Sequence, residues 1–145
     1  MAIATSGYFA ESLDRAARLS RKALQDSRAI GNQHVLEQLS DVYRECRTPD
    51  WDGYGAMPVE QDTMRCAYCI LESLPHGFPQ PSIGAEPDGQ LTFEWRTAPH
   101  RVLSVSVDPN GDLHYAGVFG PNKKYGSMAF FTSAPDELLQ LVREL

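Results

Sequence analysis

The sequence predicts an α+β protein in which helices cover one face of an antiparallel β-meander of about five strands. Up to Leu74 the apolar residues recur at the three-and-four spacing of helices, whereas from Pro79 onward they alternate with polar residues at the period of strands. Residues 86–90 and residues 108–112 share one pattern. In each, a Pro, then an Asp or Asn, then a Gly stand between two runs in which apolar and polar residues alternate, which is typical of hairpin turns. The predicted order of elements is α-α-α-β-β-β-β-β-α.

The composition is that of a single globular domain, residues 1–145. The chain is 42% hydrophobic and 22% charged, and its length suits one core better than two. Its net charge is −6 and its basic residues form no run longer than a pair such as Lys123-Lys124, so we expect no direct nucleic-acid binding. No apolar run approaches the ~18 residues of a membrane span, and the N-terminus lacks a signal-peptide pattern. The three cysteines have neither the even number nor the spacing of a disulfide framework, which fits a reducing compartment such as the cytoplasm.

Three helices are predicted before the sheet. Residues 9–28 and 33–46 form a helical hairpin, and a third helix begins at Pro58 and ends near Leu74. Two further helices exceed what one small sheet face needs, so we interpret residues 1–47 as an added interaction element on an α+β core at residues 48–145. The second helix carries one apolar stripe, made of Val35, Leu36, Leu39, Val42, Tyr43 and Cys46. From this stripe we expect partner contacts, or a homodimer through the N-terminal helices, made by Leu36, Leu39 and Tyr43.

The hairpin turns set the register of the predicted sheet. We expect two three-residue loops, closed by Gly89 and Gly111 at positive φ, and a three-residue link at residues 98–100. The register that follows puts the large side chains on one face of the sheet and the small or polar ones on the other. A fifth strand is predicted at residues 125–132 and a final helix at residues 135–142. The predicted cross-strand pairs include Ile83 with Phe93, Trp95 with Leu103, and Val105 with Tyr115.

The segment TPDWDGYGAMP at residues 48–58 is predicted to be a loop with aromatic anchors, since it contains two prolines and two glycines. Trp51, Asp52 and Tyr54 place two aromatic rings and an acid next to flexible glycines, which suits a surface that binds a partner protein. In the alternative interpretation, Trp51 and Tyr54 cap one end of the core.

Catalytic alternatives use residues of the polar sheet face. Glu94, Ser106 and His114 supply an acid, a hydroxyl and an imidazole, as a hydrolase needs, although the register places Glu94 two strands from His114, about 10 Å away. The segment PDGQLTFEWR at residues 87–96 resembles the acidic core of the PD-(D/E)xK nucleases, whose carboxylates bind Mg²⁺. The rival function is therefore a small hydrolase or metal-dependent nuclease that uses Glu94, His114 and Asp52.

Cys66 and Cys69 form a C-x-x-C in the middle of the third predicted helix. This place is away from a helix N-terminus, where the dipole would lower a thiol pKa, so we interpret both as buried structural thiols. No second Cys or His pair stands at zinc-site spacing. We therefore predict neither a metal nor a cofactor.

Three blocks of the sequence resemble a group of small bacterial proteins that has no established activity. The blocks are WDGYGAMPV at 51–59, AEPDGQLTFEW at 85–95 and VLSVSVDPNGDLHYAGVFG at 102–120. The likeness covers residues 49–145 and implies a bacterial origin and a shared fold, but it transfers no catalytic residue. Small proteins of this kind often travel with mobile elements. With no credible active site, we expect a non-catalytic protein-binding module, such as a small regulator, an antitoxin or an inhibitor of a host defence protein.

Overall fold

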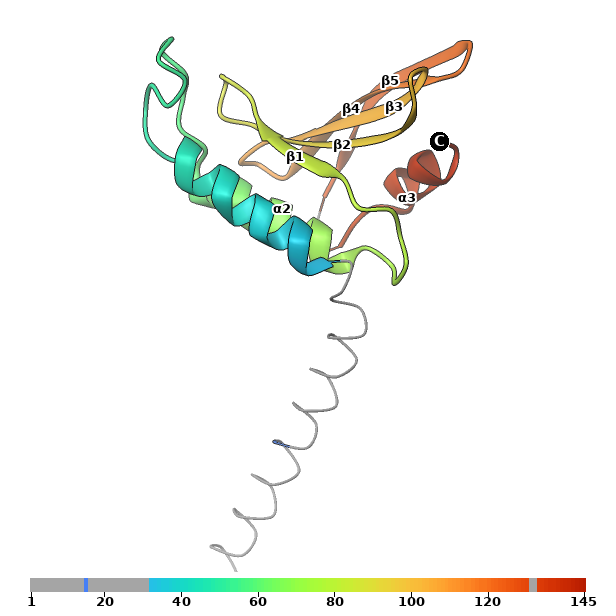
Figure 1. Cartoon of the computed structure of the whole chain (residues 1–145), viewed down its shortest axis with the longest axis horizontal. Coiled ribbons are helices and arrows are strands. Elements are labelled where there is room, and N and C mark those ends of the chain that lie inside the picture. The colour runs from blue at the N-terminus through green and yellow to red at the C-terminus, as the bar shows by residue number, and fades with distance from the viewer. Residues whose placement is uncertain (1–14, 16–31, 131–132) are drawn as a thin grey trace, which may run out of the picture.

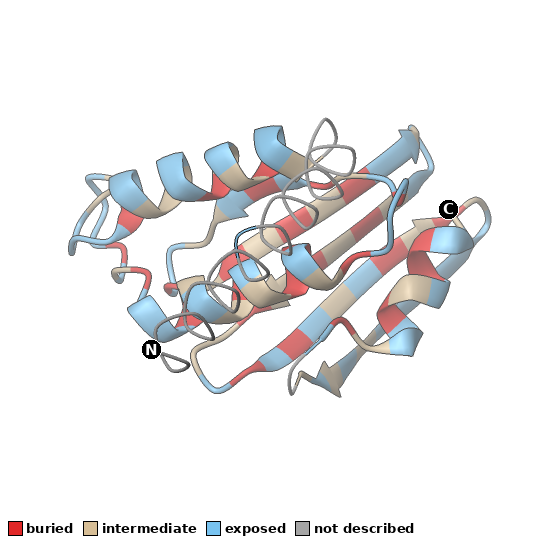
Figure 2. Cartoon of the chain, turned by 90° about the horizontal axis from the view of Figure 1, so that it is seen from below, coloured by how far each residue is buried: buried red, intermediate tan, exposed pale blue. Residues whose placement is uncertain are grey.

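The structure, a computed structural model, describes residue 15, residues 32–130 and residues 133–145. Five antiparallel strands form one sheet, and their spatial order follows the chain. A helical segment at residues 32–46 and two further helices all lie on one face of this sheet (Figures 1 and 2). The predicted α+β class and the antiparallel meander are therefore confirmed. The elements are α2 (Gln61–Ser73), β1 (Ser82–Ala85), β2 (Leu91–Ala98), β3 (Arg101–Val107), β4 (Asp112–Phe119), β5 (Asn122–Ala129) and α3 (Asp136–Arg143).

The predicted order of helices is matched only in part. Within the described part of the chain, two helical segments precede the sheet and one follows it, while the helix predicted at residues 9–28 lies outside that part, save for one residue. The segment at residues 32–46 agrees with the second predicted helix. α2 agrees with the third, except that it begins at Gln61 rather than at residue 58. The start is later because the Val59 N–H donates to the carbonyl oxygen of Cys46 (2.8 Å), which ties the approach to α2 to the end of the preceding helix.

The register of the first four strands agrees with the prediction, except at the turn from β2 to β3. Gly89 and Gly111 have φ values of 91° and 83°, as their places in the hairpin loops require. The register shifts between Arg96 and Ala98, so the link from β2 to β3 is one residue shorter than expected and includes a bulge. The confirmed pairs include Ile83 with Phe93, Trp95 with Leu103, and Val105 with Tyr115.

β5 begins at Asn122 and ends at Ala129, whereas the sequence predicts a strand at residues 125–132. Gly120 has a φ of 66° and is followed by Pro121, which forms a two-residue turn with glycine at its first central position. The turn returns the chain directly along β4, so that Asn122 already pairs with Phe119. The strand therefore starts before its side chains show any alternation.

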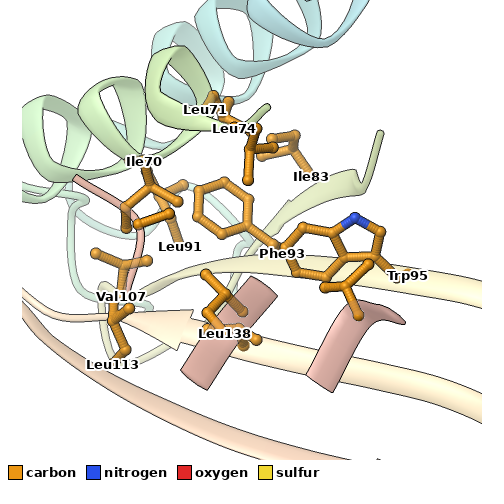
Figure 3. Packing of buried hydrophobic residues seen from close by; sticks show 14 of the residues in the cluster. Ile70, Leu71, Leu74, Ile83, Leu91, Phe93, Trp95, Val107, Leu113 and Leu138 are labelled. Atoms are coloured by element: carbon orange, nitrogen blue, oxygen red, sulfur yellow. The ribbon is translucent and has the colours of Figure 1, made fainter. Parts of the chain in front are cut away.

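One buried cluster joins the sheet to all three helical segments (Figure 3). Phe93 and Trp95 of β2 meet edge to face, with ring centroids 6.1 Å apart. Ile70 and Leu71 of α2 lie on the helix side of Phe93 (Figure 3), and both are buried. The Trp95 Nε1–H donates to the carbonyl oxygen of Pro79 (2.9 Å), so the indole is buried without an unpaired donor.

The apolar stripe of residues 32–46 belongs to this core. Val35, Leu39 and Cys46 are buried in the cluster, and Leu36 and Tyr43 are partly buried against it. Leu39 has no exposed surface, so the expectation that it contacts a partner does not fit this fold. A boundary at residue 48 likewise does not divide the core, because buried residues on both sides of it share one cluster.

Candidate functional site

The loop between residues 46 and 59 is built around two carboxylates. Asp50 Oδ1 accepts a hydrogen bond from the Gly55 N–H (2.6 Å), which closes the loop across five residues. Asp52 Oδ1 accepts from the Tyr54 N–H (2.8 Å) and from the Ala56 N–H (3.1 Å). Hydrogen bonds to an ionised acceptor are stronger than neutral ones, so these contacts hold the loop in one conformation.

Main-chain contacts and an indole attach the loop to the rest of the molecule. The Trp51 Nε1–H donates to the carbonyl oxygen of Met57 (2.8 Å), and the Trp51 ring packs partly buried against the core. The Met57 N–H donates to the carbonyl oxygen of Pro87 (2.8 Å), which joins the loop to the turn between β1 and β2. Ala56 and Val59 are buried. The loop is therefore anchored at its base and at its side.

Three residues of this loop adopt the left-handed backbone conformation, and together they expose Tyr54. Gly53 and Gly55 have φ values of 76° and 84°, and Asp50, which is not a glycine, has a φ of 59°. The Tyr54 side chain, between the two glycines, is 93% exposed, and Met57 is 59% exposed. Figure 1 shows this loop projecting beyond the end of the helix at residues 32–46, beside the β1–β2 turn.

The three loop residues predicted to contact a partner have different positions. Trp51 and Asp52 are partly buried, and both donate or accept hydrogen bonds inside the loop, so they shape it. Tyr54 alone of the three presents its whole side chain to solvent. Sequence reasoning missed Asp50 and Met57. The signal for Asp50 was its spacing, because an Asp ahead of Gly53 and Gly55 is well placed to accept from loop amides.

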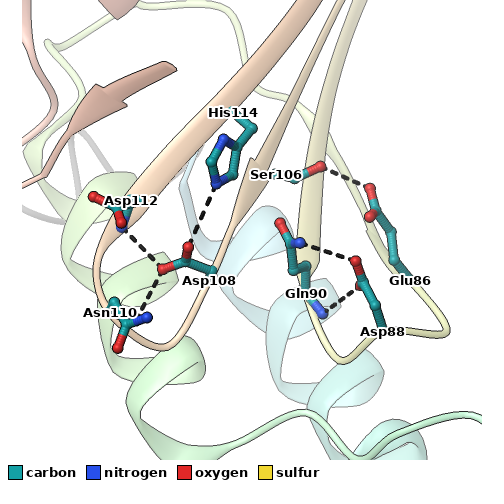
Figure 4. A network of polar contacts seen from close by, with 8 residues as sticks. All are labelled: Glu86, Asp88, Gln90, Ser106, Asp108, Asn110, Asp112 and His114. Atoms are coloured by element: carbon teal, nitrogen blue, oxygen red, sulfur yellow. Dashed lines mark hydrogen bonds and ion pairs between the residues drawn. The ribbon is translucent and has the colours of Figure 1, made fainter. Parts of the chain in front are cut away.

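On the helix-free face of the sheet, the proposed catalytic residues form separate contacts rather than a relay (Figure 4). Ser106 lies opposite His114, as predicted, but its hydroxyl donates to Glu86 Oε1 (2.7 Å). His114 Nε2 lies 3.4 Å from Asp108 Oδ2, and Glu94 pairs with Arg96, at 3.3 Å.

Sequence reasoning did not identify the two acids that reach Ser106 and His114. Glu86 Oε1 also accepts from the Thr92 hydroxyl (2.6 Å), so this one carboxylate oxygen bridges two strands. Asp108 also accepts from the backbone N–H groups of Asn110 (2.9 Å) and Asp112 (3.0 Å), so it holds its own turn. Glu86 and Asp108 lie in the two hairpin-turn segments, where the turn pattern alone accounts for the residues present. Their residue types therefore did not point to contacts with Ser106 and His114.

The C-x-x-C segment lies inside α2, and both of its cysteines are free and only partly buried, rather than buried as predicted. Burial raises the pKa of the Cys66 thiol, and the neighbouring Cys69 and Asp62 raise it further. A raised pKa keeps the thiol protonated at neutral pH, which opposes nucleophilic and metal-binding roles. In the described ranges, His, Cys, Asp and Glu side chains form no group of three or more that is placed to hold a metal ion.

No family model, curated protein or solved structure gives a significant match to this chain. The resemblance of the three sequence blocks to a bacterial group therefore stays a prediction. No helix of the described ranges has the length and the apolar character to cross a membrane. The exposed Tyr54 and the hydrogen-bonded conformation of the loop between residues 46 and 59 therefore supply the main structural basis for a functional proposal.

Proposed function

We propose that this chain is a non-catalytic protein-binding module whose principal anchor is Tyr54. The observation that carries the proposal is the 93% exposure of this side chain on a loop that two carboxylates and an indole N–H hold in place. The module suits a small cytoplasmic regulator, an antitoxin or an inhibitor that covers a surface of another protein.

The energetics of association favour such an anchor. A tyrosine that enters a pocket on a partner buries on the order of 150–250 Å² of surface, and tyrosine is enriched among the residues that dominate binding energy. A loop that is already ordered avoids the entropic cost of ordering on binding. An isolated exposed aromatic is common on protein surfaces, but this one stands on a loop whose two carboxylates, Asp50 and Asp52, accept hydrogen bonds from the loop's own backbone N–H groups.

The environment of Tyr54 defines the surface that would meet the partner. Met57 is the other strongly exposed apolar side chain of the loop, and its flexible thioether can adapt to irregular surfaces. The Asp52 carboxylate is occupied by the Tyr54 and Ala56 amides. The partner's contacts are therefore expected to be apolar at the centre, with Tyr54 and Met57 supplying them.

The rival hydrolase or nuclease has weaker support from the geometry. Asp52 accepts from loop amides, Glu94 pairs with Arg96, and His114 contacts Asp108. A hydrolytic relay needs the hydroxyl, the imidazole and an acid in one chain of hydrogen bonds. The Ser106 hydroxyl instead donates to a carboxylate that does not contact the imidazole.

Site-specific photocrosslinking tests the proposal. The full chain, with p-benzoylphenylalanine in place of Tyr54, is produced in cells of the native host and irradiated. We expect a covalent adduct with one other protein, because residue 54 lies at the centre of the proposed interface. The matched control carries the same group at Tyr68, which is 47% exposed on α2, and should give no adduct. Adducts from position 68 and none from position 54 would place the interface elsewhere and overturn the proposal.

A further inference from the structure

β5 is an edge strand of the sheet in the described part of the chain. Its eight residues pair with β4 in one unbroken register, and no other described strand pairs with it. Natural edge strands are usually short, bulged, interrupted by proline or charged, most often by lysine, because an open edge pairs with other chains. The opposite edge follows this rule, since β1 has four residues between Pro81 and Pro87. β5 is longer, contains no proline and has no bulge, and its two lysines, Lys123 and Lys124, lie near one end and leave residues 125–129 without a charge.

The direction of the free backbone groups on β5 follows from its pairing with β4. The Phe130 N–H donates to the carbonyl oxygen of Gly111 (2.9 Å), and these two residues continue the register in which β5 pairs with β4. Hydrogen-bonded pairs alternate along an antiparallel ladder, so the even-numbered residues of β5 bond to β4. The odd-numbered residues direct their N–H and C=O groups away from the sheet. These residues are Lys123, Tyr125, Ser127 and Ala129.

We propose that β5 pairs antiparallel with β5 of a second copy of this chain, with Gly126 opposite Gly126 across a two-fold axis. Lys123 then lies opposite Ala129 and Tyr125 opposite Ser127. In this register every outward N–H and C=O of the four odd-numbered residues has a partner. A slip in either direction leaves some of these groups unpaired at both ends of the seam, which is the line where the two β5 strands meet.

The charges on β5 favour the same register. Lys123 and Lys124 lie near one end of the strand. Antiparallel pairing about a two-fold axis therefore places the lysines of the two copies at opposite ends of the seam. Their opposite residues become Ala129 and Met128, whereas registers centred on the lysines place like charges opposite each other. Lys124 does not block the edge, because it contacts Glu144 and lies 5.1 Å from the Phe119 ring centroid.

The pairing also covers an exposed aromatic side chain. Tyr125 is 84% exposed and lies on the helix-free face of the sheet, since it pairs with Ala116 rather than with a core residue. In the proposed register the two Tyr125 side chains are diagonal neighbours across the seam, at a spacing of roughly 7–8 Å that aromatic rings can bridge. The proposal is independent of the Tyr54 loop, which lies beside the β1–β2 turn.

Sedimentation velocity on the full chain over a range of concentrations tests the pairing. We expect the wild type to be a monomer–dimer mixture and Ser127→Pro to be a monomer, because proline removes an outward N–H at the centre of the seam. The matched control is Ala85→Pro, which also removes an outward N–H, but from the β1 edge, and should dimerise as the wild type does. A wild type that is monomeric at every concentration overturns the proposal.

A charge exchange at residue 129 tests the register, and it remains decisive if Ser127→Pro does not fold. Ala129 is exposed, so its substitution should leave the monomer intact. Ala129→Glu puts a carboxylate opposite Lys123 of the second copy, and Ala129→Lys puts a like charge there. We expect dimer Kd values for the two variants that differ on the order of tenfold at low salt and converge at high salt. Equal Kd values at low salt would contradict the register.

Discussion

Two carboxylates hold the loop that presents Tyr54, and each serves different amides. Asp50 Oδ1 accepts from Gly55, while Asp52 Oδ1 accepts from Tyr54 and Ala56. The sequence predicts the loop and its aromatic residues, because glycines and prolines mark it clearly. It does not separate the roles of Trp51, Asp52 and Tyr54, since an Asp directly before a glycine fits a ligand contact and a turn equally well. Only their relative exposure separates Tyr54, the proposed anchor, from Trp51 and Asp52, which shape the loop.

Asp52→Ala should loosen one half of the loop without releasing the other. Hydrogen exchange followed by NMR should show faster exchange at the Tyr54 and Ala56 amides, which lose their acceptor, and a smaller change at Gly55, which Asp50 still holds. Asp88→Ala is the matched control, because Asp88 likewise accepts a backbone N–H, from Gln90, but in the β1–β2 turn. Unchanged exchange at Tyr54 and Ala56 in Asp52→Ala would show that the carboxylate does not order the loop.

At the scale of the elements, turn chemistry made β1 to β4 predictable. Gly89 and Gly111 each set a hairpin loop, and a period of two then places the buried apolar side chains on one face. The start of β5 was not predictable in this way, because Asn122, Lys123 and Lys124 are all exposed and show no alternation. A strand that is exposed on both faces carries little hydrophobic signal.

The helix at residues 32–46 shows why the count of helices misled the sequence reasoning. A small sheet face was expected to need few helices, but Val35, Leu39 and Cys46 lie in the same buried cluster as the side chains of α2 and the sheet. α3 packs against the same face of the sheet near β4, where the Tyr115 hydroxyl donates to Glu137 Oε1 (3.3 Å). The sheet face therefore has room for all three helical segments.

Leu39→Ala should cost about 2–5 kcal/mol of unfolding free energy, the usual range for truncating a fully buried leucine. Leu36→Ala is the matched control on the same helix, and it should cost less because Leu36 is only partly buried. Urea unfolding followed by circular dichroism measures both. If Leu39→Ala is as stable as the wild type, the helix lies outside the core, as the interaction-element interpretation of residues 1–47 requires.

At the scale of the whole molecule, the proposed binding loop and the open sheet edge are well separated. The loop is joined to the β1–β2 turn through Met57 and Pro87, whereas β5 is the opposite edge strand. Pairing through β5 would leave the loop of each copy free, so a dimer would carry two Tyr54 anchors. Two linked sites raise apparent affinity for a partner that presents two matching surfaces.

The central claim is that Tyr54 anchors a partner protein. The most direct test uses the partner identified by crosslinking. The purified partner's affinity is measured for the wild type and for variants at Tyr54 and Tyr68. Truncating an anchor tyrosine costs about 2 kcal/mol or more, which is roughly a 30-fold rise in Kd. Isothermal titration calorimetry should show this loss for Tyr54→Ala, a small change for Tyr54→Phe, and none for Tyr68→Ala, whose side chain lies on α2. A Kd for Tyr54→Ala equal to that of the wild type would contradict the claim.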